Sequence, residues 1–124
     1  MTREIKFRVW STFNKEELIY LNEFTSKDLE SCDNWKVMQY TGLKDKNGER
    51  IFEGDIVEIK RVKIKRNKNT FIDKVIYNNE LCGFRFEGLA DDYLDFYDWL
   101  NEGAAFRVIG NIYENPELLG GKNE

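Results

Sequence analysis

Apolar and polar residues alternate along most of this chain, and a period of two predicts β-strands. Near the start, Ile5, Phe7 and Val9 alternate with charged residues that include Lys6 and Arg8. This pattern is typical of a strand with one face in the core and its charged face in solvent. Similar short runs predict further strands at 18–21, 35–40, 56–59, 70–77, 82–87 and 106–109.

The period changes between residues 89 and 102. Leu89, Tyr93, Phe96 and Leu100 follow one another at helical spacing, and acidic residues occupy the opposite side. The pattern predicts one amphipathic helix with an acidic outer face. Its end is expected at Gly103, a residue common after a helix C-terminus.

Turn-forming residues are concentrated in the centre of the chain. The segment 44–49 contains an Asn-Gly pair, whose residues tolerate positive φ, and 53–55 forms a second turn at once. Because these residues set backbone geometry between apolar flanks, we interpret them as a structural turn signature. Its members are Gly42, Asp45, Asn47, Gly48, Gly54 and Asp55.

The strands, turns and single helix together predict a mainly β protein. The short strands and tight turns favour a small antiparallel barrel-like or strongly bent sheet with one short amphipathic helix. No linker or internal repeat divides the chain, so we expect a single domain over 1–124, with a frayed tail at 120–124.

Composition excludes several kinds of chemistry. The 124 residues include no His, and 19 Lys and Arg against 23 Asp and Glu leave a net charge of −4. Without His there is no Ser-His or Cys-His nucleophile pair and no common zinc site, so we expect no cofactor and no catalytic centre. Cys32 and Cys82 are expected to be reduced thiols in a cytoplasmic protein, with a Cys32–Cys82 disulfide as the alternative. We expect no signal peptide and no membrane span.

A run of basic residues begins at the end of one predicted strand. Lys60, Arg61, Lys63, Lys65, Arg66 and Lys68 fall close together with no acidic residue among them. Such a stripe is suited to the phosphates of a nucleic acid. The alternative is a solvated edge strand, because lysines on an edge discourage pairing with other chains.

The acidic residues of the predicted helix allow a third, less favoured hypothesis, that the protein is an enzyme. Asp55 with one or two of Asp91, Asp92 and Asp95 would be the carboxylates of a hard-metal site, as in a nuclease-like enzyme. Nothing in their spacing requires convergence on a metal, so we favour a solvated helix face.

Three parts of the chain resemble the YopX family. They are Arg3–Trp10, the central Met38–Gly48 with Ile51–Val57, and Val108–Leu119. The resemblance implies a mainly β fold and an origin among the accessory genes of phages and prophages. It carries over no catalytic residue.

These observations predict a non-enzymatic phage or prophage accessory protein that binds another macromolecule or itself. The expected partners are a second copy in a homo-oligomer, and a phage or host protein. Nucleic-acid binding through residues 60–68 is the alternative. We expect the protein in the cytoplasm of the host cell, away from the membrane.

Overall fold

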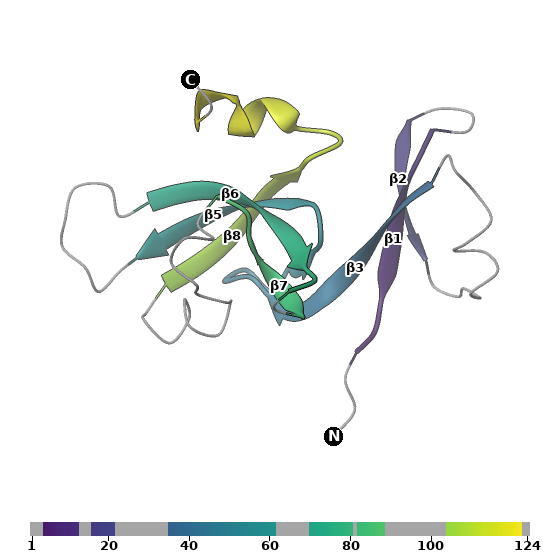
Figure 1. The fold of residues 1–124 in the computed structure, drawn as a ribbon, viewed down its shortest axis with the longest axis horizontal. Coiled ribbons are helices and arrows are strands. Elements are labelled where there is room, and N and C mark those ends of the chain that lie inside the picture. Colours follow the sequence, from purple (N-terminus) through teal and green to yellow (C-terminus); the bar gives the residue numbers. More distant parts are fainter. Residues whose placement is uncertain are drawn as a thin grey trace.

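The computed structural model contains two four-stranded antiparallel sheets (Figure 1). It describes residues 4–12, 16–21, 35–61, 70–80, 82–88 and 104–122. The first sheet comprises, in spatial order, β2 (Glu17–Leu21), β1 (Phe7–Ser11), β3 (Trp35–Lys44) and β4 (Arg50–Phe52). The second comprises β7 (Gly83–Phe86), β6 (Thr70–Asn78), β5 (Asp55–Arg61) and β8 (Ala104–Asn111).

The predicted mainly β fold with a strongly bent sheet is confirmed. Strand β3 pairs with β1 over its first half and with β4 over its second, with a register shift between Tyr40 and Lys44. It therefore runs diagonally from the β1–β2 pair toward the second sheet, which curls into a half-barrel (Figure 1).

Helical structure differs from the predicted pattern. The predicted helix at 89–102 lies outside the described residues. Within them, the helical element is a 3-10 helix, η2 (Pro116–Lys122), which the hydrophobic pattern did not predict. Helix η2 follows β8 closely and extends into the segment where a frayed tail was expected. No helix in the described ranges is long and apolar enough to span a membrane.

The main hydrophobic core belongs to the second sheet. Its fully or nearly buried side chains come from β5, β6, β7 and β8, and β4 of the first sheet adds Ile51. Phe86 and Phe106 meet edge to face at 5.2 Å between ring centroids. These branched and aromatic side chains supply the apolar burial that drives sheet formation.

Strand β1 is buried on both faces, which corrects the half-buried strand predicted from its alternation. Val9 is 0% exposed on the apolar face, and on the charged face Arg8 is only 3% exposed. The prediction was wrong because alternation within a strand does not show what else covers its polar side. Here the second sheet and the C-terminal turn cover it.

Two apolar contacts near Arg8 also join the first sheet to the rest of the chain. The Trp10 ring of β1 stacks on Tyr113, after β8, at 5.4 Å between centroids. Met38 of β3 packs against Gly54, the turn residue that connects β4 to β5. The Gly54 N–H donates to the Val75 carbonyl, and its own carbonyl accepts from Ile112 N–H, both at 2.9 Å. This turn therefore binds three parts of the chain together.

Candidate binding cleft between the sheets

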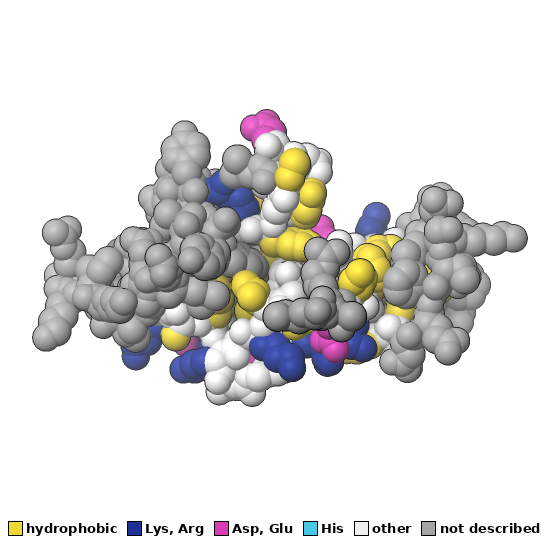
Figure 2. Space-filling view, turned by 90° about the horizontal axis from the view of Figure 1, so that it is seen from below, with side chains coloured by type: hydrophobic (Ala, Val, Ile, Leu, Met, Phe, Trp, Pro, Cys, Tyr) yellow, Lys and Arg dark blue, Asp and Glu magenta, His cyan; other side chains and the backbone are white. Residues whose placement is uncertain are grey.

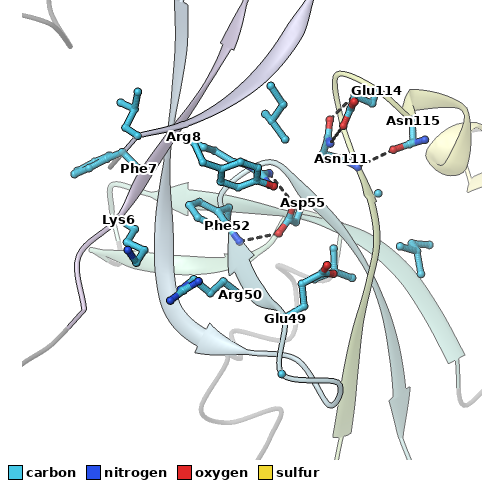
Figure 3. A pocket seen from close by; sticks show the side chains of 17 residues that line it. Lys6, Phe7, Arg8, Glu49, Arg50, Phe52, Asp55, Asn111, Glu114 and Asn115 are labelled. Atoms are coloured by element: carbon cyan, nitrogen blue, oxygen red, sulfur yellow. Dashed lines mark hydrogen bonds and ion pairs between the residues drawn. The ribbon is translucent and has the colours of Figure 1, made fainter. Parts of the chain in front are cut away.

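A cleft of about 600 Å³ lies where the two sheets meet (Figure 3). One wall comes from β1, β2 and β4, and the other from β8 and the turn that follows it. Its charged and amide side chains are Lys6, Arg8, Glu49, Arg50, Asp55, Asn111, Glu114 and Asn115. Its apolar and aromatic side chains are Phe7, Leu18, Tyr20, Leu21, Phe52, Val108 and Ile109.

A buried ion pair occupies the centre of this cleft. Arg8 Nη2 lies 2.6 Å from Asp55 Oδ1, with both side chains at most 4% exposed. Asp55 Oδ2 accepts the Phe52 N–H at 2.7 Å, and the Arg8 guanidinium lies 4.6 Å from the centroid of the Phe52 ring. Because Arg8 belongs to β1 and Asp55 begins β5, the pair connects the two sheets directly.

Burial changes the proton affinity of Asp55. It raises the pKa of this carboxyl from 3.8 to about 6, because loss of hydration outweighs the stabilisation of the charge by Arg8 and the Phe52 N–H. The folded chain thus binds this proton more tightly than the unfolded chain does.

We expect Asp55 to make folding stability depend on pH. A raised acid pKa means that its contribution is greatest below about pH 4, falls as the pH rises, and levels off above about pH 6. The change amounts to about 3 kcal/mol. Urea unfolding of the parent and of Asp55→Asn across this window measures it as the difference between the two curves. A difference that is independent of pH would contradict the prediction.

A second cationic group lies at the outer end of the first wall. Arg50 of β4 donates from Nε and Nη2 to the two carboxylate oxygens of Glu4, at 2.7 and 3.0 Å. The Arg50 side chain also lies over the Tyr40 ring, 5.8 Å from its centroid. The hydrogen bond from Arg50 lowers the pKa of Glu4, so the pair is charged over a wide pH range. Lys6 lines the cleft near the same end (Figure 3).

Asp45 attaches the loop between β3 and β4 to the edge of β8. Its Oδ1 accepts the N–H groups of Asn47 and Glu49, and its Oδ2 accepts that of Val108, each at 2.9 Å. The Lys46 N–H donates to the Phe106 carbonyl at 3.0 Å. Burial alone would raise the pKa of Asp45, but the three backbone donors outweigh it and lower the pKa. The loop is thereby held against the second sheet, with Glu49 at the cleft.

Removing the Asp45 carboxylate is expected to destabilise the fold by about 2 to 3 kcal/mol, because Asp45→Ala leaves three partly buried N–H groups without their acceptor. Asp45→Asn retains one oxygen and should lose less. Since the pKa is lowered in the folded state, the contribution of Asp45 is present above pH 3.8 and disappears as the pH falls through the lowered value. Thermal unfolding at neutral and acidic pH measures both effects. Equal stability of the Ala variant and the parent at neutral pH would contradict this role.

Asn111 shapes the other wall by folding the chain back after β8. Its Oδ1 accepts the N–H groups of Tyr113 and Glu114, and its Nδ2 donates to Glu114 Oε1 at 2.7 Å. Asn115 Oδ1 accepts the Asn111 N–H at 3.2 Å. A Cβ at Gly110 would lie 2.6 Å from that same oxygen, so the close turn requires glycine there. The turn places Glu114 and Asn115 along the cleft.

The structure separates the site residues predicted from the sequence into three groups. Gly48 and Asp55 of the turn signature line the cleft, and Asp45 and Gly54 hold its walls. Gly42 also has positive φ but no neighbour close to where a Cβ would lie. Asn47 is exposed in the loop and donates to Asp45.

The basic run and the metal hypothesis are described only in part. Lys60 is exposed on β5 and Arg61 ends that strand, whereas Lys63, Lys65, Arg66 and Lys68 lie outside the described residues. Asp91, Asp92 and Asp95 also lie outside them. Among the residues that are described, no group of three metal-ligating side chains converges. Cys82 is a free, exposed thiol, and Cys32 lies in an undescribed segment.

Sequence reasoning missed several residues of the cleft, above all Arg8, Arg50, Glu49 and Glu114. One signal was available. The three segments that resemble the YopX family, Arg3–Trp10, Met38–Gly48 with Ile51–Val57, and Val108–Leu119, supply most of the cleft-lining residues, including Arg8 and Glu114, whereas Glu49 and Arg50 fall between the two central stretches. Segments that meet in space although they lie far apart in sequence mark the joint between the sheets.

Two bent antiparallel sheets, joined by a buried ion pair at the centre of a cleft, define a mainly β protein. The family model described as YopX protein matches residues 6–120, and the chain therefore belongs to the YopX family. The crystal structure of protein EF1440 from Enterococcus faecalis is similar, with a TM-score of 0.59 and 27% sequence identity. That match covers 95% of this chain and 99% of the other. No curated protein matches.

Proposed function

We propose that the protein is a non-enzymatic binding module and that the cleft between its sheets receives the ligand. The observation that carries this proposal is the construction of the cleft. Its volume of about 600 Å³ is within the usual range of ligand sites. Its walls are fixed by Asp45, Gly54 and Asn111 through hydrogen bonds between distant segments. A site held in advance loses less entropy on binding.

The central carboxylate supports binding rather than catalysis. Asp55 Oδ1 is engaged by Arg8 and Oδ2 by the Phe52 N–H, at 2.6 and 2.7 Å. A general base needs a free oxygen within reach of the substrate proton. Asp55 instead uses both oxygens to join the sheets.

An NMR screen of the full-length chain tests the proposal. The probes are mixed capped peptides, oligothymidylate and a set of small organic fragments, each added to ¹⁵N-labelled protein. We expect at least one class to shift the amide signals of Lys6, Tyr20 and Val108–Asn111. Tyr20→Ala should weaken that response, whereas Tyr77→Ala, a change of another exposed strand tyrosine away from the cleft, should not. The proposal fails if every class leaves the cleft signals unmoved.

Nucleic-acid binding through residues 60–68 is the second candidate function. Figure 2 shows Lys and Arg side chains, with Asp and Glu among them, along one border of the molecule, and Lys60 is exposed on β5. Part of the positive charge on this sheet is neutralised, because Arg107 pairs with Glu58 at 3.2 Å. A gel-shift series with Arg61→Glu/Lys63→Glu tests it. Binding should weaken with added salt and with the double substitution. Absence of binding at low salt would end this candidate.

We further propose that the module acts in the cytoplasm as a phage- or prophage-encoded homo-oligomer. Exposed Ile5, just before β1, and Tyr20 of β2 support self-association, because solvent-exposed apolar surface favours contact with another molecule. Light scattering during size exclusion tests it, and a monomer at high protein concentration would contradict it.

A further inference from the structure

We infer that the ligand of the cleft is an extended polypeptide segment with an acidic side chain at one end and a basic side chain at the other. The inference rests on the proposed function and specifies its ligand class. It depends on how charge, strand edge and apolar surface are distributed around the cleft.

The charges of the cleft are separated by wall. Lys6 lies at the β1–β4 end beside Arg50, whose charge is paired with that of Glu4, whereas Glu114 lies across the cleft beside β8 (Figure 3). Glu49 lies between Arg50 and β8, and its charge contributes to raising the pKa of Asp55. Arg8 and Asp55 neutralise each other between the two groups. The cleft is therefore positive at one side and negative at the other, which favours a ligand carrying both signs.

The negative wall includes the edge of a sheet. Strand β8 is the outermost strand of the second sheet, and its residues Val108–Asn111 line the cleft. Just before them, the same edge already bonds to a chain segment that is not a strand, since Phe106 O accepts from Lys46 and Val108 N–H donates to Asp45. An extended peptide uses such an edge by adding main-chain hydrogen bonds next to a strand.

Apolar surface opposite β8 suits the side chains of a peptide. Tyr20 is 57% exposed and lies directly across from Arg8 in the β1–β2 register. Leu18 is its neighbour on the same face of β2, because alternate residues of a strand share a face. The cleft therefore has aromatic and aliphatic side chains between its two charged ends. This arrangement matches an extended peptide, in which apolar and charged side chains can alternate.

One donor of a cleft-lining side chain is unpaired among the described residues. Arg8 Nε is buried and has no hydrogen-bond partner in the described part of the chain. A buried donor without an acceptor is costly, and a shift of the Arg8 side chain that brings Nε to a peptide carbonyl would remove this cost. Nucleic acid fits less well, because Glu49 and Glu114 would repel its phosphates.

Four defined peptides test the inference by NMR titration of the full-length chain. All are acetylated and amidated octapeptides with the same Val-Thr-Tyr core. The first and last residues of the four peptides are Glu and Lys, Lys and Glu, Glu and Glu, or Lys and Lys. We expect one of the mixed-charge peptides to bind at least about tenfold more tightly than either like-charged peptide. Its shifts should centre on Lys6, Tyr20 and Val108–Asn111.

A charge-swapped cleft provides the control. Lys6→Glu/Glu49→Lys exchanges one charge on each side and should abolish the preference between the two mixed-charge peptides, because Arg50 and Glu114 then each face a new opposite charge on their own side. Equal binding of all four peptides, or shifts confined to other surfaces, would overturn the inference. If fragments or oligothymidylate move the cleft signals and no peptide does, the cleft binds a ligand of another class. If nothing moves them, the proposed function fails as well.

Discussion

An Arg8→Met variant is expected to lose about 3 to 5 kcal/mol of unfolding free energy near neutral pH. The substitution retains apolar volume but removes the cation from Asp55, which is 2% exposed, so that the folded chain must either hold an uncompensated buried charge or bind a proton there. The lost contact also links β1 to β5, so both sheets are affected. Urea unfolding followed by tryptophan fluorescence measures the loss.

A second arginine provides a matched control. Arg50→Met removes a guanidinium from the same sheet, but its partner Glu4 is exposed and the pair lies in water. Such pairs add little to stability, so the unfolding midpoint should change only slightly. Arg8→Met/Asp55→Asn should recover much of the single-variant loss, because no uncompensated charge remains buried. Equal effects of the two arginine substitutions would contradict the role assigned to the buried pair.

A Gly54→Ala variant is expected to lose about 2 to 4 kcal/mol of unfolding free energy. Gly54 has φ +88°, which side-chain-bearing residues rarely adopt, and its Cβ would lie 2.8 Å from Met38 Sδ. Met38 is 3% exposed and has little room to move away. Backbone strain and overpacking therefore act together at the turn that joins the sheets.

Gly48→Ala separates these two causes. Gly48 has a similar φ of +84°, but a Cβ added there would have no neighbour within 4 Å. It should show the backbone cost alone and be less destabilised than Gly54→Ala. Thermal unfolding of both variants gives the comparison, and equal losses would show that the contact with Met38 contributes nothing.

Local patterns predicted the strands well and their surroundings poorly. The alternating and apolar runs at 56–59, 70–77 and 106–109 correspond to β5, β6 and β8. Strand β4 has three residues between two turns, which is too short for alternation to be recognised. The solvent-facing position expected for Arg8 was wrong, since the charged face of β1 lies against another sheet.

The cleft was beyond prediction from local patterns for a related reason. Its residues lie at 6–8, 18–21, 48–55 and 108–115, so its closure depends on contacts between segments far apart in sequence. The hydrogen bonds of Asp45 show which contacts local patterns predict and which they do not. Its bond to Asn47 is local and follows from the turn chemistry of aspartate, whereas its bond to Val108 spans 63 positions.

The sequence by itself determined the mainly β architecture, the positions of most strands and the central turns, because side-chain periodicity and φ preferences act over a few neighbouring residues. It also determined family membership through three separated segments. The tertiary structure alone decided that Arg8 meets Asp55 and that charges of opposite sign line opposite sides of a cleft. These outcomes depend on the twist of β3 and the packing of two sheets, and burial and charge pairing are set by that packing.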